Sequence, residues 1–442
     1  MSTCVRCLSR QLSITDAAAS IASRSQQYVL IPAVAALTEL RNPDSPTDIL
    51  VRVRRIDSLD GLRGIAAGTV LLHHGLLLFP TLAEPYYTNA PKPFGSFEWW
   101  AIHTPLHVLW EGKAGVYVFF VLSGFVLTLM ATRRTAFNWV AYYPHRLLRL
   151  YLPVWAAVVL AIATFYLVPR VSPSGAWLEE RPETVTLTAI IRDLTLVAGN
   201  GGLASPLWSL TWEILFSIAL PLVILACVWV ARAHWSMLAL CVIVTTAGGV
   251  LNETSLMYPP MFIVGVILAL RRDHVREWCS RVSTPGWIGI IVFATLATTS
   301  RWLVMAFDAP RAISQGTAGV MLIGAAMFLI IALEWRWASR ILNSKPLRWL
   351  GMVSFSLYLV HEPIIVAAGF AFPDAPLLAL LASIAITAAV APGFYYAVER
   401  PSIQLAARVR MAISARRQRA ENHSGQALYD RLLRSEAREA RP

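Results

Sequence analysis

Charged residues are scarce in this chain of 442 residues. Asp, Glu, Lys and Arg make up 14% of it, against about 25% in an ordinary globular domain. Apolar residues make up 56%, and the mean hydropathy is +0.56. A water-soluble protein has no surface on which to hide so many apolar side chains, so a soluble enzyme is excluded. The solvent that fits this composition is the lipid bilayer.

Cysteine is also rare. The five cysteines do not form an even set, and Cys227, Cys241 and Cys279 lie in or beside apolar segments. No disulfide framework is therefore indicated. Cys4 and Cys7 form a lone CxxC pair without partner ligands nearby, so we expect no bound zinc and no other metal. The sequence has no internal repeat.

Long apolar segments account for most of the chain between residues 56 and 401. A membrane helix needs about 20 mainly apolar residues. By that measure the sequence predicts an all-α polytopic membrane protein with ten transmembrane helices. The predicted spans are 62–80, 113–131, 150–169, 206–231, 235–251, 256–270, 286–307, 316–334, 349–372 and 376–398.

Lysine and arginine are concentrated before the first predicted span, in alternate loops and in the C-terminal tail. Basic loops stay on the cytoplasmic side of a membrane, so we predict that both termini are cytoplasmic. We expect a multi-pass protein of the bacterial cytoplasmic membrane. The net charge of +12 then reflects orientation and contact with membrane lipid, and we expect no nucleic-acid partner.

Polar, basic segments flank the predicted membrane domain of residues 56–401. Residues 1–55 are expected to form an N-terminal extension outside the fold. The first 27 residues faintly resemble a transit peptide, although a misassigned start or a disordered leader is the preferred interpretation. Residues 402–442 are expected to form a basic cytoplasmic tail, either an amphipathic helix on anionic lipid or a solvated segment.

Ionisable residues at membrane depth are functional candidates because they are costly to place there. On the first predicted span, Arg63 and His74 are eleven residues apart, which puts them on one helix face and roughly 16 Å apart along the axis. His74 is expected near the middle of the bilayer, and His73 points about 100° away. Alone, these residues would fit a snorkelling arginine and a hydrogen-bonded core histidine.

Two other predicted spans carry polar residues at a similar depth. Ser354, Tyr358 and His361 fall at positions i, i+4 and i+7 of the ninth span. Ser209 and Glu213 are four residues apart on the fourth span, with Glu213 about 10 Å below the outer surface. Such a cluster serves either as a proton path in a transporter or as an acid–base site in an enzyme. Depth alone does not choose between them.

Three arginines are expected together at the cytoplasmic mouth. Arg63 lies at the start of the first span, and Arg146 and Arg149 are about one helical turn apart before the third. Guanidinium groups are planar, bidentate donors that suit phosphates. Retention of positive charge on the cytoplasmic side explains most such arginines without a ligand. Below a histidine at membrane depth, however, they suit a phosphorylated co-substrate that enters from the cytosol.

An ordered set of six motifs runs through the chain. They are LDGLRGIAA (59–67), GVYVFFVLSGF (115–125), RLLRLY (146–151), PLWSLTWE (206–213), LGMVSFSLYLVH (350–361) and ERP (399–401). Together they resemble the motifs of the membrane-bound acyltransferase 3 family, ten-helix enzymes known mainly for O-acylating sugars. The first two motifs are specific. The second is expected to serve packing, with Gly124 permitting close helix approach.

The sequence departs from the family pattern at three positions. Tyr117 stands where many members have Asp, Ile214 where many have a second Glu, and Phe355 where a tyrosine usually follows the serine of the late motif. No carboxylate-based role is available at the first position. These differences bear on the subfamily and the acceptor rather than on the reaction class.

The resemblance implies a division of roles between the candidate residues. Acyl-CoA would dock from the cytosol with its phosphates near Arg63, Arg146 and Arg149. His74 would be the general base or would carry the acyl group transiently, and Glu213 would orient a hydroxylated acceptor. Arg63, His74 and Glu213 are thus the expected catalytic residues. The residues expected to line the passage are Ser209, Ser354, Tyr358 and His361.

The resulting prediction is an integral-membrane O-acyltransferase, with acetyl as the preferred acyl group. It would use acyl-CoA as a co-substrate, hold no permanent cofactor, and act on a sugar-containing surface, secreted or lipid-linked acceptor. The alternative is a proton-coupled transporter in which His74, Glu213 and His361 form the proton path. Dependence on acyl-CoA separates the two. The sequence does not give the acceptor, the acyl chain length or the oligomeric state.

Overall fold

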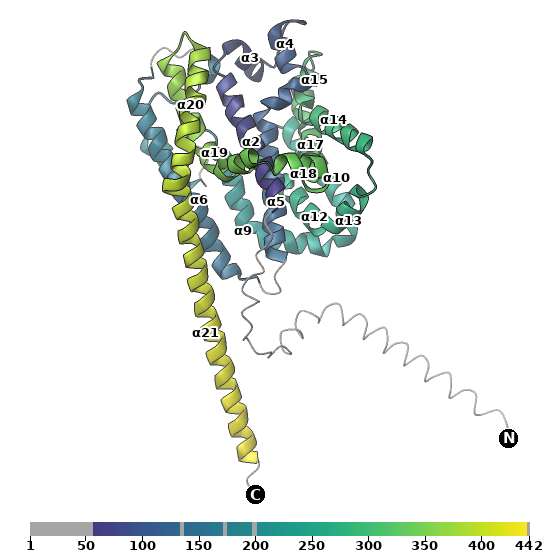
Figure 1. Ribbon diagram of the computed structural model, residues 1–442, viewed down its shortest axis with the longest axis vertical. Coiled ribbons are helices and arrows are strands. Elements are labelled where there is room, and N and C mark those ends of the chain that lie inside the picture. The colour runs from purple at the N-terminus through teal and green to yellow at the C-terminus, as the bar shows by residue number, and fades with distance from the viewer. Residues whose placement is uncertain (1–55, 133–136, 171–174, 197–200, 440–442) are drawn as a thin grey trace, which may run out of the picture. The chain divides into compact units, whose positions relative to one another are not determined.

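The computed structural model (Figure 1) describes residues 56–132, 137–170, 175–196 and 201–439. The predicted N-terminal extension and the Cys4–Cys7 pair lie outside the described residues. Within them, all regular structure is helical, which confirms the predicted all-α class. The chain is therefore an integral membrane protein built from apolar helices.

In the described part of the chain, seven helices are long and apolar enough to cross a membrane, or nine if each of two bent pairs is counted as one span. The long helices are α5 (Gly112–Thr132), α6 (Trp139–Leu167), α9 (Leu207–Trp229), α10 (His234–Val250), α17 (Ala318–Glu334), α19 (Lys345–Ala371) and α20 (Pro376–Phe394). The bent pairs are α2 (Asp57–Leu76) with α3 (Pro80–Thr88), and α11 (Thr254–Met257) plus α12 (Pro259–Leu270) with α13 (Arg272–Cys279).

The seventh predicted span, 286–307, is interrupted in the structure. Helix α14 (Thr284–Thr298) is short, and α15 (Ser300–Met305) follows it at once. Every other predicted span coincides with one of the long helices or bent pairs. Ten crossings and two cytoplasmic termini therefore stay predictions, whereas the positions of the apolar helices agree with the sequence.

The helices that carry the predicted site differ in how deeply they are buried. Helices α5 and α19 are buried along most of their length, whereas only a minority of the residues of α6, α9 and α20 are buried. The exposed positions include large apolar side chains such as Val159, Leu222 and Leu377, as expected for helices that face lipid. Helix α2 packs against both α5 and α19, so its polar residues point into protein rather than lipid.

Two glycines allow the central helices to approach closely. A Cβ at Gly351 of α19 would lie 1.9 Å from the Asp60 carbonyl oxygen of α2. A Cβ at Gly124 of α5 would lie 2.1 Å from the Phe262 carbonyl oxygen of α12. No larger residue fits at either contact without moving a helix. The packing role expected for Gly124 is confirmed.

The C-terminal segment continues the last apolar helix. A π-helical turn, η4 (Tyr395–Glu399), joins α20 to α21 (Arg400–Glu439), which extends beyond the other helices in Figure 1. Ser402 and Ala406 are buried, α21 packs along α6, and Ser414 accepts a hydrogen bond from Asn138 (3.3 Å). The predicted boundary at 401/402 therefore falls within a helical stretch, and the first part of the tail belongs to the folded bundle.

Candidate functional site

A cavity of about 130 Å³ lies between α2, α5, α6, α9 and α19. Its wall is mostly apolar, with Phe119, Phe120 and Met130 of α5 and Phe355 of α19 among the lining residues. Seven of the nine predicted site residues also line it. These seven are Arg63, Arg146, Arg149, Ser209, Glu213, Ser354 and Tyr358. We call this space the arginine cavity.

Arg146 is already paired within this cavity. Its guanidinium forms an ion pair with the Glu213 carboxylate, and its Nε donates to Ser217 Oγ (3.1 Å). Ser123 Oγ donates to the same carboxylate (3.3 Å). The two residues were assigned to different substrates from the sequence, but the structure couples them. The ion pair and its hydrogen bonds leave Arg146 with fewer free N–H donors, and Glu213 with fewer free lone pairs, for a substrate.

The reason for this coupling is the start of α6. The third span was predicted to begin at residue 150, which would leave Arg146 at the membrane surface. The helix instead begins at Trp139, where the Asn138 side chain accepts from the Ala141 N–H (3.0 Å) and caps it. Arg146 thus lies two turns inside the helix and reaches Glu213 across the bundle. The helix therefore begins before the predicted span, because polar residues in its first turns hide that part of it from a hydropathy window.

Arg63 and Arg149 differ from Arg146. Among the described residues, neither side chain makes a hydrogen bond or ion pair that would occupy its guanidinium, and both line the cavity. Nearby, the buried carboxylate of Glu399 accepts from the Ser356 amide (3.1 Å) and hydroxyl (2.6 Å). Two guanidinium groups with free N–H donors form a site suited to an anionic ligand.

His74 and His361 are in direct contact, although 287 residues separate them. His74 Nδ1 lies 3.0 Å from His361 Nε2 and 3.1 Å from the Val70 carbonyl oxygen. His361 Nδ1 lies 3.1 Å from the Leu357 carbonyl oxygen. A carbonyl only accepts, so we assign the proton of His361 to Nδ1 and leave its Nε2 as the acceptor. His74 then carries its proton on Nδ1, which leaves His74 Nε2 with a free lone pair.

The histidine pair does not line the arginine cavity. Tyr358 lies between the two. Its ring centroid is 5.7 Å from that of His361, its hydroxyl lies 2.7 Å from Ser209 Oγ, and it donates to the Pro206 carbonyl oxygen (3.1 Å). The predicted polar residues therefore form two neighbouring compartments, the arginine cavity and the surroundings of the histidine pair, and Tyr358 contacts both.

The segment between the third and fourth predicted spans covers the histidine pair. Trp177 of α7 (Ala176–Glu179) is buried, with its ring 6.1 Å from that of His74. Arg181 stacks on Trp177 (4.5 Å) and donates to the buried Glu362 carboxylate (2.8 Å). Ser205 donates to the same carboxylate. The sequence reasoning gave no role to Trp177, Arg181 or Glu362, although Glu362 follows His361 at membrane depth, and that position was a usable signal.

The described residues include no group of three or more His, Cys, Asp or Glu side chains arranged to hold a metal ion. His74 and His361 are joined by a direct N···N hydrogen bond. What the two compartments offer is therefore an anion site, an imidazole pair with one free lone pair, and a tyrosine between them.

An apolar helical bundle with an anion site beside a polarised histidine is the architecture of a membrane-embedded group-transfer enzyme. A model of the family Acyl_transf_3, described as an acyltransferase domain, matches residues 56–396. The chain belongs to this acyltransferase 3 family and is a membrane acyltransferase. It is 26% identical over 343 residues to "Acyltransferase MdmB" of Streptomyces mycarofaciens, covering 71% of this chain and 80% of that protein. No solved structure matches the chain.

Proposed function

We propose that the protein transfers an acyl group from cytosolic acyl-CoA to a hydroxyl group of a sugar-containing acceptor, with His74 as the general base. The observation that carries the proposal is the arrangement of the two compartments. Tyr358 lines an arginine cavity with open donors, and its ring also lies beside that of His361, whose partner His74 is assigned a free Nε2. Family membership supports the transfer of an acyl group.

The acyl donor would occupy the arginine cavity. The volume of this cavity, about 130 Å³, is close to the volume of about 150 Å³ of an apolar cavity that binds one benzene molecule. The thioester end with a short acyl chain fits such a volume, and the nucleotide does not. Arg63 and Arg149 would therefore bind phosphate at the mouth of the cavity, and a short chain such as acetyl is the proposed acyl group.

The reaction would use both histidines. The acceptor oxygen attacks the thioester carbonyl carbon while His74 Nε2 takes its proton, and the carbon–sulfur bond breaks to release the CoA thiolate. The imidazolium formed on His74 is stabilised by its Nδ1–H hydrogen bond to His361. The proton then passes to the thiolate. The same Nε2 atom would carry the acyl group if transfer takes two steps.

The acceptor would approach His74 from the side that α7 covers, because the arginine cavity receives the donor from the other side. If the predicted orientation is right, that side is the outer face of a bacterial cytoplasmic membrane. A sugar-containing surface, secreted or lipid-linked molecule is the proposed acceptor class.

The test is CoA release from labelled acetyl-CoA by membranes that contain the wild type or His74→Ala. Mass spectrometry then locates the label. We expect release by the wild type alone, with the label on a glycan or lipid. If neither acetyl-CoA nor longer acyl-CoAs are consumed in a His74-dependent way when acceptor-containing membranes are present, the transporter alternative replaces this proposal.

A further inference from the structure

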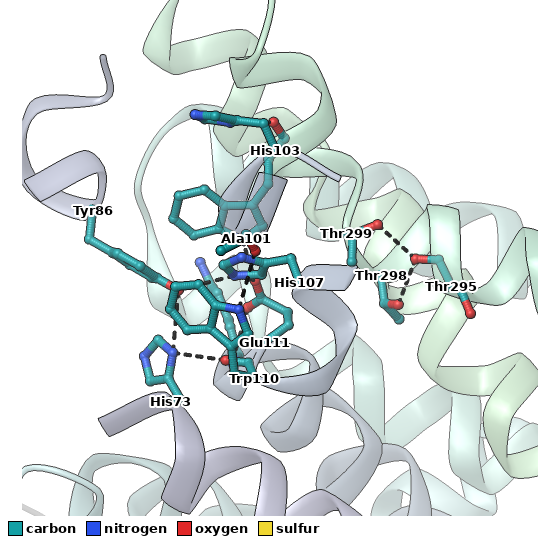
Figure 2. A network of polar contacts seen from close by, with 12 residues as sticks. His73, Tyr86, Ala101, His103, His107, Trp110, Glu111, Thr295, Thr298 and Thr299 are labelled. Atoms are coloured by element: carbon teal, nitrogen blue, oxygen red, sulfur yellow. Dashed lines mark hydrogen bonds and ion pairs between the residues drawn. The ribbon is translucent and has the colours of Figure 1, made fainter. Parts of the chain in front are cut away.

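A second polar cluster surrounds the C-terminal end of α2, on the side of His73 (Figure 2). Its members come from five separate parts of the chain. They are His73 of α2, Tyr86 of α3, His107 of η2 (Pro105–Leu109), Glu111 before α5 and Trp302 of α15. None of them lines the arginine cavity. We call this set the Glu111 cluster.

Glu111 is the charged centre of this cluster. It is 1% exposed, and its carboxylate accepts from Trp302 Nε1, from His107 Nε2 (3.0 Å) and from the Lys113 backbone N–H (3.1 Å). Burial would raise the pKa of Glu111, but the hydrogen bond and charge interaction with His107, the charge interaction with His73 and the hydrogen bond from Trp302 together lower that pKa to about 2. Glu111 is therefore a buried anion with three donors.

Hydrogen bonds connect this anion to His73. Tyr86 OH lies 3.2 Å from His107 Nε2 and 3.3 Å from His73 Nδ1. Tyr86 and Glu111 approach the same nitrogen of His107, which excludes a nucleophile triad, because that arrangement requires opposite nitrogens. The cluster is suited to holding side chains in place rather than to activating the Tyr86 hydroxyl.

His73 is held tightly where this chain of contacts ends. Its Nδ1 contacts the Trp110 carbonyl oxygen (3.2 Å), and its ring stacks on the Trp110 ring. On another side, a Cβ at Gly112 would lie 2.6 Å from His73 Cγ. The ring of His73 meets that of His74 edge-on, with centroids 5.1 Å apart. His74 thus lies between His73 and His361, whose ring centroid is 5.0 Å away.

We propose that Glu111 is a positioning residue for acyl transfer, acting through His107, Tyr86 and His73 to fix the ring of His74. The inference rests on the proposed function for its kinetic consequence. Its geometric consequence, a fixed His74 ring, does not depend on that function. Gly112 is part of the same arrangement, because its lack of a side chain leaves room for the His73 ring beside the Glu111 carboxylate.

The first test is Glu111→Gln, which keeps the shape of the side chain, removes its charge and sets an amide NH₂ against a donor. We expect kcat to fall about 10- to 100-fold, as for a displaced catalytic group, with an unchanged KM for acyl-CoA. Glu84→Gln is the matched control. Glu84 is exposed on α3 and pairs only with Lys92 among the described residues. It should leave both constants unchanged.

The second variant is Gly112→Ala, which displaces His73 and leaves the Glu111 carboxylate in place. We expect the same loss of kcat, and a double variant no worse than the more impaired single one, because the two act on one element. Gly112→Ala also provides the test if Glu111→Gln does not fold. A loss of folded protein with unchanged kcat per folded molecule in both variants would make the cluster a structural brace and overturn the inference.

A readout without turnover separates this inference from the proposed function. Diethyl pyrocarbonate modifies accessible imidazoles, and peptide mass spectrometry distinguishes His73 from His74. The rate at which diethyl pyrocarbonate modifies His74 should change in Glu111→Gln and stay unchanged in Glu84→Gln. An unaltered rate overturns the positioning role even in an active enzyme. If the wild type consumes no acyl-CoA, the proposed function fails, and this rate alone decides the positioning role.

Discussion

The arginine cavity and the Glu111 cluster use charge in opposite ways. In the cavity, the guanidinium groups of Arg63 and Arg149 make no hydrogen bond or ion pair among the described residues, although the charge of Glu399 is close enough to interact with both. In the cluster, Glu111 is buried and accepts from three donors. Open donors beside a void indicate a ligand site, whereas a saturated buried charge indicates a framework that fixes its neighbours. The same helix, α2, contributes to both regions.

The largest effect on acyl transfer should come from substitution of His74. In the two proposals, the Glu111 cluster positions this residue and the arginine cavity holds the donor on which it acts. We expect His74→Ala to abolish transfer, a loss of about 10²- to 10⁴-fold for a missing general base, while the protein inserts normally. His73→Ala should be milder, because His73 acts only through its neighbour. CoA release per folded molecule measures both. Equal loss in the two variants would remove the distinction between them.

A smaller effect, on binding alone, should follow from Arg63→Ala. Loss of one phosphate donor should raise the KM for acyl-CoA about tenfold with little change in kcat. Arg63→Lys should lie between the two, since it keeps the charge and loses the bidentate fork. Arg232→Ala, at an exposed arginine, is the control. An unchanged KM in Arg63→Ala would contradict the assignment of this cavity to the acyl donor.

Glu213 should affect stability more than catalysis, because its partner Arg146 is a protein group. Glu213→Gln leaves a buried guanidinium without its anion and should lower the free energy of unfolding by about 1–3 kcal/mol. Adding Arg146→Met should recover part of the loss. Thermal unfolding in detergent measures this. A stable Glu213→Gln protein with a large loss of kcat would instead restore the catalytic role predicted for Glu213.

The smallest effect concerns the pH dependence of the Glu111 cluster. The folded state lowers the pKa of Glu111 from 4.5 to about 2, so its ionised form stabilises the fold. That contribution is complete above about pH 4.5 and is lost as the pH falls towards 2. The difference in melting temperature between the wild type and Glu111→Gln should therefore shrink from pH 7 to pH 3. A constant difference would mean that the Glu111 charge does not stabilise the fold.

The sequence predicted the helices well where apolar composition determines them. At α6 the helix begins at Trp139, before the predicted span, because Arg146 and Arg149 near the helix start count against a membrane span when their partners are unknown. Glu213, 67 residues away, makes that start possible by pairing with Arg146. Local periodicity cannot show a contact of that range.

The site was predictable only in part, because some of its contacts also join residues that are far apart in the sequence. Helical spacing placed Arg63 and His74 on one face, and family motifs indicated His361, but only the fold shows that His74 and His361 touch. The Glu111 cluster was missed altogether. Its members lie in different helices and connecting segments without a common period, so no pattern in the sequence joins Glu111 to His73.

Tyr358 bears on a side reaction of the proposed enzyme, the hydrolysis of its acyl donor. A catalyst that binds both an activated thioester and a hydroxylated acceptor can lose the thioester to attack by water. The ring of Tyr358, tethered to Ser209 and to the Pro206 carbonyl, lines the cavity and lies beside His361. In the proposed reaction, a donor held in this mainly apolar space would meet little water before an acceptor is in place. A side chain on α19 would then limit how much of the thioester is lost to hydrolysis.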